Sequence, residues 1–172
     1  MSPIYLSPWR IDLIVRPGVH VPVPHAVLAR AIAGALETVG APSPASIGLV
    51  LTDDTELTEL NRVHMGAEGP TDVLSFPLLP ASSFQRGGPP APVFSLPPGR
   101  RLHLGDIVLS VERAVAQAAE GRGGQTGDVR WSSADELRLL VTHGTLHICG
   151  WDHGAPAEEA AMRALEQRLL GS

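Results

Sequence analysis

Two hydrophobic periods alternate along this chain, and their alternation constrains the fold more than any other feature. Apolar residues at every second position predict a strand over Trp9–Val15. Apolar residues at helical spacing run from Val27 to Val39, and Gly40 is placed to end that helix. The same reading predicts strands over 46–51, 73–76 and 107–109, a helix opened by Asp53 with Glu56, and a helix capped near Ser110. Strands and helices are interleaved but too few for a doubly wound sheet, so we expect an α+β fold with one mixed sheet.

Size and composition favour a single domain over residues 1–172. A chain of 18.1 kDa can bury one core, and 44% hydrophobic with 18% charged residues is typical of a globular protein rather than a disordered one. The formal net charge of −5 excludes a globally basic surface. Any contact with nucleic acid would therefore need a local basic patch.

The number of cysteines and the hydropathy of the chain indicate in which cellular compartment the protein is expected. The single cysteine, Cys149, excludes an internal disulfide and fits a reducing cytosol. No apolar run reaches the roughly 18 residues that span a bilayer, and the N-terminus lacks the basic segment of a signal peptide. We expect a cytoplasmic protein with no membrane association and no disulfide partner.

A segment rich in proline and glycine, Leu78–Arg100, interrupts the alternation. It holds six prolines and three glycines in 23 residues, which disfavours a regular strand or helix. One interpretation is a surface insertion. The other is a lid or an RNA-contacting loop, because Arg86, Arg100 and Arg101 lie within it or at its edge.

Three of the seven histidines fall within eleven residues, at a spacing that predicts a metal site. Ser133 and Glu136 have the spacing of a capping box, which would open a helix over this region. His143 and His147 are four residues apart and share one helix face. Gly150 then permits a left-handed turn, after which His153 can return as a third ligand. Three neutral nitrogen ligands with an open fourth position are typical of a catalytic zinc site.

The spacing also resembles the zinc helix of metzincin proteases, with one difference. In those enzymes a glutamate follows the first histidine and acts as the general base. Here that position is Gly144, so peptide hydrolysis by that mechanism is disfavoured. Cys149 lies two residues after His147, points elsewhere on the helix, and is interpreted as a buried apolar residue.

The segment His143–His153 resembles the signature of the YbeY family, bacterial metal-dependent endoribonucleases of rRNA maturation and ribosome quality control. The resemblance extends from about Ile47 onward. Further segments match in order: Leu60-Asn61 followed by Gly69–Pro77, then Leu104–Ile107, then Met162 and Glu166 on a last helix.

The resemblance implies a mixed four-stranded sheet packed with about five helices, and a site at the mouth of a cleft. It implies that His143, His147 and His153 hold one zinc ion per chain. The substrate would be single-stranded RNA or rRNA, with the ribosome or a ribosomal protein as partner. The ion would polarise a phosphoryl oxygen and activate water. No catalytic side chain is assigned.

One departure from the family bears on catalysis. Where the family usually carries a tyrosine and an arginine, this chain has His64 and Met65. A thioether cannot stabilise charge on a phosphoryl oxygen as a guanidinium does. Either Arg62 replaces the arginine, or His64 takes part, or cleavage is weak. Asp152 would either orient a ligand imidazole or cap the turn after Gly150.

Two other functions remain open. The first is a non-catalytic assembly factor, stabilised by zinc, that binds rRNA or a ribosomal protein. The second is a metallohydrolase of small phosphoesters or amides. Met65 favours the first, whereas the open three-ligand site favours an enzyme.

Overall fold

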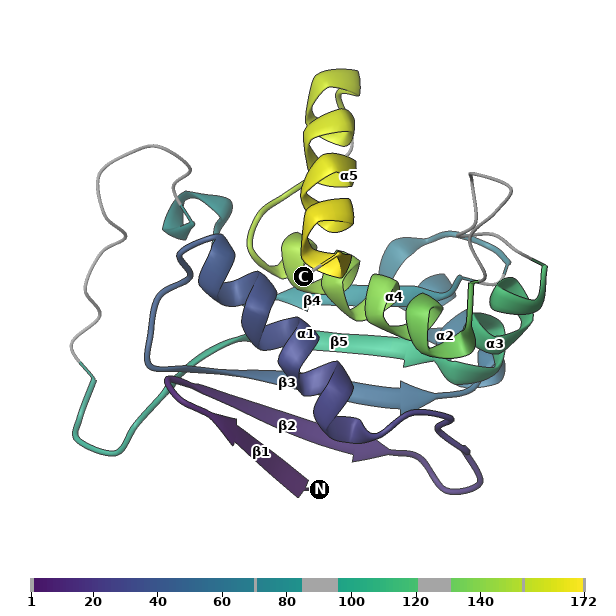
Figure 1. Ribbon diagram of the computed structural model, residues 1–172, viewed down its shortest axis with the longest axis horizontal. Coiled ribbons are helices and arrows are strands. Elements are labelled where there is room, and N and C mark those ends of the chain that lie inside the picture. Colours follow the sequence, from purple (N-terminus) through teal and green to yellow (C-terminus); the bar gives the residue numbers. More distant parts are fainter. Residues whose placement is uncertain (1, 70, 85–95, 121–130, 153, 172) are drawn as a thin grey trace.

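A five-stranded mixed sheet with helices on both faces makes up the protein (Figure 1). The computed structural model describes residues 2–69, 71–84, 96–120, 131–152 and 154–171. The strands are β1 (Ser2–Leu6), β2 (Trp9–Val15), β3 (Ala45–Thr52), β4 (Val73–Pro77) and β5 (Leu102–Ser110). The helices are α1 (His25–Thr38), α2 (Asp54–Leu60), α3 (Val111–Ala119), α4 (Ser133–Ile148) and α5 (Pro156–Leu170), with a π-helical turn η1 (Asn61–Met65) and a 3-10 turn η2 (Ala81–Ser83). The predicted α+β class with five helices is confirmed.

The strand order is β1-β2-β3-β5-β4, and both directions of pairing occur. The inner pairs β2–β3 and β3–β5 are parallel, whereas the outer strands β1 and β4 run antiparallel to their neighbours. The sheet has five strands rather than the four expected, because β1 was missed. Its five residues include Pro3, which is tolerated on an edge strand but weakens the strand pattern in the sequence.

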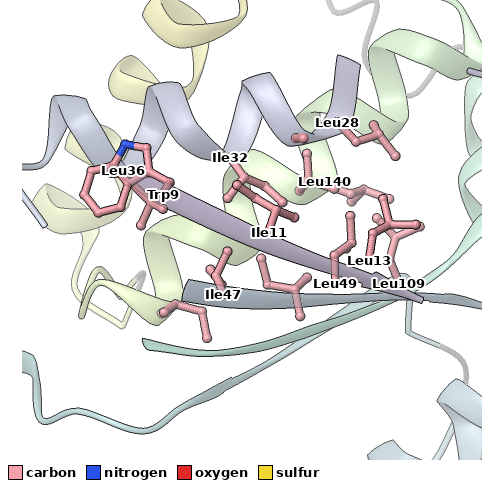
Figure 2. Close-up of a cluster of buried hydrophobic side chains, with 14 of the residues drawn as sticks. Trp9, Ile11, Leu13, Leu28, Ile32, Leu36, Ile47, Leu49, Leu109 and Leu140 are labelled. Carbon is pink, nitrogen blue, oxygen red and sulfur yellow. The ribbon is translucent and has the colours of Figure 1, made fainter. Parts of the chain in front are cut away.

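The main core lies between one face of the sheet and helices α1 and α4 (Figure 2). Alternate residues of β2 and β3, such as Ile11 and Ile47, face this side and are fully buried. The parallel register places these two isoleucines side by side. From above them, Ile32 of α1 and Leu140 of α4 pack onto the sheet. The apolar residues that define the predicted strands and helices therefore pack together in one core.

Smaller clusters cover the other face of the sheet and the end of α4. Leu57 of α2 packs on Leu74 and Val108, which point away from the main core. Leu146 of α4 packs against Met162 and Leu165, and these contacts hold α5 against α4.

The helix starts agree with the sequence signals, with one correction. The Asp53 side chain accepts from the Glu56 N–H, and the Ser110 hydroxyl accepts from the Arg113 N–H. The capping box of α4, however, is formed by Ser132 and Asp135, one residue earlier than predicted. Glu136 is fully buried and accepts a 2.7 Å hydrogen bond from the indole of Trp131. Burial of Glu136 beside an indole, which the spacing of residues did not reveal, explains the shift.

The proline-rich segment is partly integrated into the core. Residues 85–95, including Arg86, lie outside the described residues. Before them, Phe84 is buried in the main core. At the end of the segment, Arg101 donates to the Pro8 carbonyl at 2.7 Å and lies over the Tyr5 ring. Both partners belong to the β1–β2 edge, so Arg101 serves that edge of the sheet. No helix within the described part of the chain is long and apolar enough to cross a membrane.

Candidate metal centre

The histidine-bearing helix α4 approaches the sheet closely because of Gly144. A Cβ at this position would lie 2.9 Å from Ile107 Cγ2 and 3.2 Å from Ser75 Oγ. The Ser75 hydroxyl donates to the Gly144 carbonyl at 2.9 Å. Gly144, which follows the first histidine, is therefore in contact with β4 and β5, and a glutamate side chain would not fit there. This packing is the physical reason why the protease-type base is absent.

His143 and His147 face each other from successive turns of α4. Their Nε2 atoms are 3.0 Å apart, and the ring planes are inclined by 79°. The structure thus brings these two predicted ligands together. His153, the third predicted ligand, lies outside the described residues, so its place in the site stays a prediction.

In each imidazole, the nitrogen that faces away from the other histidine, Nδ1, lies beside a hydrogen-bond acceptor. Nδ1 of His143 is 2.5 Å from Oε1 of Glu166 on α5, and Nδ1 of His147 is 2.8 Å from the Trp151 carbonyl oxygen. A carboxylate and a carbonyl can only accept, so Nδ1 of each ring is the donor. In the neutral rings, each Nε2 then carries a lone pair directed at the other. Two lone pairs at 3.0 Å repel each other unless a metal ion or a shared proton lies between them.

The turn after α4 supplies one of these acceptors. Gly150 has φ +84°, and a Cβ there would also lie 2.9 Å from Ala81 Cβ. The Trp151 N–H donates to the Leu146 carbonyl at 3.0 Å, and the Gly150 N–H donates to the His147 carbonyl at 3.1 Å. This pair of bonds defines a Schellman motif. The predicted glycine turn is confirmed, and the residue after it returns its carbonyl to His147.

These features fit a bound metal ion. Metal-ligating histidines generally donate their other N–H to a carboxylate or backbone carbonyl, as both do here. A zinc ion takes imidazole nitrogens at about 2.0–2.1 Å, so one ion can bind both Nε2 atoms. Among the described residues no group of three or more potential ligands is present. The described part of the chain therefore supplies two of the three predicted nitrogens.

Cys149 does not belong to this donor set. It is buried in the main core, and burial raises the pKa of its thiol to about 12. The thiol is therefore neutral, whereas a metal binds the thiolate. The interpretation of Cys149 as a buried apolar residue is confirmed.

The residues near the departure from the family pattern lie in the π-helical turn η1. Arg62 is exposed and bound to Glu59, with Nη2 2.6 Å from Oε1. That pairing raises the pKa of Arg62 and lowers the pKa of Glu59. The His64 ring lies edge-on to Phe76, at 5.4 Å between centroids, and Met65 is half exposed. In the described residues no hydrogen bond links Arg62 to the histidine pair.

Sequence reasoning missed both acceptors behind the imidazoles. Of the two described rings, that of His143 is held by Glu166 and that of His147 by the Trp151 carbonyl, whereas Asp152 was one of two open readings in the sequence. The Asp152 N–H donates to Glu158 of α5 at 3.3 Å. A backbone carbonyl has no sequence signal except the glycine that shapes its turn. The only sequence signal of Glu166 is its match to the last helix of the family, and 23 residues separate it from His143.

Comparison with known proteins gives matches over most of the chain. The family model of endoribonuclease YbeY matches residues 22–172, which begins earlier than the resemblance seen from Ile47. The endoribonuclease YbeY of Roseiflexus castenholzii is 38% identical over 163 residues, which cover 94% of this chain and 91% of the relative. That of Symbiobacterium thermophilum is 42% identical over 149 residues, covering 85% of each chain.

A solved structure supports the fold independently. The solution structure of a Thermotoga maritima protein matches 94% of this chain and 89% of its own, with a TM-score of 0.52 at 19% identity. At that identity the likeness bears on the fold alone. The family model and the curated relatives each cover most of the sequence, so the chain belongs to the YbeY endoribonuclease family.

Proposed function

We propose that this protein is a metal-dependent endoribonuclease that cleaves single-stranded RNA. The observation that carries the proposal is the histidine pair: two Nε2 atoms 3.0 Å apart, each ring held at Nδ1 by an acceptor. Membership of the endoribonuclease family supports RNA as the substrate. We further propose that residues 1–172 act as one domain in the cytoplasm, in rRNA maturation and ribosome quality control, with the ribosome or a ribosomal protein as partner.

The chain's residues divide the work of the site among them. His143, His147 and His153 would hold one zinc ion, which supplies Lewis acidity toward a phosphoryl oxygen and lowers the pKa of water when bound. Gly144 supplies no base and keeps α4 close to the sheet. Single-stranded RNA suits such a site, because its backbone can bend into a cleft that a duplex cannot enter.

A second function is favoured by the pairing of Arg62, the arginine nearest to the position where the family carries an arginine and this chain carries Met65. Arg62 is bound to Glu59 at the surface, and Met65 occupies the family position. Without a guanidinium at the scissile phosphate, charge on the phosphoryl oxygens would be less stabilised. The alternative is therefore a zinc-stabilised assembly factor that binds rRNA or a ribosomal protein without cutting it.

Cleavage of a labelled single-stranded RNA, with zinc content measured on the same preparations, tests the proposal. The wild type should cut, and His147→Ala should lose at least about 100-fold in rate, beyond the roughly 10–100-fold effect of removing an outer-shell partner. His20→Ala is the matched control, because His20 is exposed before α1. Equal cutting by all three preparations would show a contaminating nuclease and contradict the proposal. Zinc binding by the wild type without cutting would favour the assembly factor.

Arg62→Ala tests whether Arg62 replaces the missing arginine. A loss of cleavage without a loss of bound zinc would assign the RNA contact to Arg62. An unchanged rate would mean that the Glu59–Arg62 pair is a surface ion pair only.

A further inference from the structure

We propose that Glu166 is a positioning residue: through His143 it fixes the imidazole tautomer and places a negative charge behind the metal site. The predicted effect on zinc affinity rests on the proposed metal-binding function, whereas the hydrogen bond between Glu166 and His143 does not. The carboxylate comes from α5, whereas both histidines belong to α4. The last helix of the chain would thereby become part of the metal centre.

The contact between Glu166 and His143 has the features of a strong, directed hydrogen bond. Oε1 lies 2.5 Å from Nδ1, which is short even for a charge-assisted bond. Glu166 is buried, at 8% exposure, and a buried carboxylate is costly unless it is paired. Within the described part of the chain, it is hydrogen-bonded to His143, and no arginine pairs with it. The carboxylate is therefore committed to the imidazole.

The packing of α5 fixes where that carboxylate lies. Leu165, the neighbour of Glu166, and Met162 one turn earlier are both buried against Leu146 of α4. At the end of α5, the Leu170 carbonyl accepts from Arg138 of α4 at 3.2 Å. Hydrophobic and polar contacts thus hold α5 on both sides of Glu166, so its position is set before any ion is present.

The two histidines are held by acceptors of different charge. His147 donates to the neutral Trp151 carbonyl, whereas His143 donates to the anionic Glu166. Both acceptors select the tautomer with Nε2 open toward the shared point. The anion additionally makes the His143 imidazole a more basic ligand. A purely structural ion pair would join α5 to α4 but would not require His143 to present Nε2 to the other histidine.

The tautomer can be read without any metal. Long-range 1H–15N NMR of the metal-free protein, recorded at alkaline pH, shows which imidazole nitrogen carries the proton. We expect the proton on Nδ1 of His143 in the wild type and in Glu166→Gln, whose amide oxygen can still accept. In Glu166→Ala the proton should distribute between both nitrogens.

Zinc affinity, measured by competition with a chelator, provides the second readout. Glu166→Ala should weaken binding by about 10- to 100-fold, the range found for such outer partners. Glu166→Gln should fall in between, since it keeps the acceptor and loses the charge. Glu37→Gln is the matched control, because it makes the same change at an exposed position of α1 and should bind zinc like the wild type.

These measurements separate this inference from the proposed function. If the wild type binds no zinc, the proposed function fails, while loss of the Nδ1 preference in Glu166→Ala still supports the positioning by Glu166. If the wild type binds zinc and both Glu166 variants bind it equally well, the inference is overturned. A proton on Nε2 of His143 in the metal-free wild type would overturn it as well. Glu166→Gln keeps the shape of the side chain, so it also serves if Glu166→Ala unfolds α5.

Discussion

At the scale of single residues, Gly144 shows how packing decides the chemistry of this site. The position after the first histidine could carry a carboxylate in a zinc hydrolase, yet here its backbone lies against Ile107 and Ser75. Any side chain would push α4 away from β4 and β5. The histidine pair can therefore lie this close to the sheet because Gly144, the residue after the first histidine, has no side chain.

Gly144→Ala should destabilise the protein, whereas the same change at Gly34 should stabilise it. At Gly144 the new methyl would overlap Ile107, and overpacking typically costs about 1–3 kcal/mol. At Gly34, inside α1, nothing lies within 4 Å of a new Cβ, and alanine gains roughly 0.8–1.0 kcal/mol over glycine in a helix. Urea denaturation of both variants measures the two free energies of unfolding. Equal effects of the same sign would contradict this account of Gly144.

At the scale of elements, two helices end in the same way, but only one of these ends belongs to the site. After α1, the Ala41 N–H donates to Leu36 and the Gly40 N–H to Glu37, at 3.0 and 3.1 Å. The turn at Gly150 has the same pair of bonds and returns the Trp151 carbonyl to His147. The two Schellman turns share their local structure, and their surroundings give them different consequences.

Gly150→Ala and Gly40→Ala should therefore differ in zinc affinity. Both glycines have positive φ, +84° and +66°, so alanine should cost roughly 1–2 kcal/mol at each turn. The loss should be larger at Gly150, where Ala81 is also in contact with the new methyl. Only Gly150→Ala should weaken zinc binding, since it displaces the Trp151 carbonyl. Chelator competition together with thermal unfolding checks this, and equal zinc affinity in both variants would argue against a role for the turn.

At the scale of the whole molecule, ion pairs join segments that are far apart in the sequence. Arg16, just after β2, binds Glu56 of α2 with contacts of 2.9 and 3.1 Å, and Thr52 at the end of β3 also donates to this carboxylate. The hydrogen bond from Arg16, followed by that from Thr52, lowers the pKa of Glu56. The contact links the first parallel strand pair to the helix on the other face of the sheet.

This lowered pKa predicts a dependence of stability on pH. The folded pKa of Glu56 lies below its unfolded value of about 4.3, so its contribution is complete above that value and is lost as the pH falls through the folded pKa. Glu56→Gln should lose about 0.2–1 kcal/mol at pH 7, since the pair is partly exposed. The difference from the wild type should vanish once the pH lies below the folded pKa of Glu56, because the carboxyl group is then protonated. Urea denaturation across this range measures it, and a difference that grows in acid would refute the assignment.

Most of the elements and the two facing histidines could be predicted from the amino-acid sequence. Hydrophobic periods were sufficient for β2, β3, α1 and the histidine helix, because each is long and faces one core. The spacing of His143 and His147 placed both rings on one helix face, and Gly150 marked the turn. These are local properties, fixed by backbone geometry within a few residues.

Tertiary structure alone decided what stands behind those rings. Glu166 meets His143 only because Leu146, Met162 and Leu165 dock α5 on α4, and no local pattern encodes that contact. Contacts between distant segments depend on how whole elements pack, whereas helix faces and turns depend on the residues themselves.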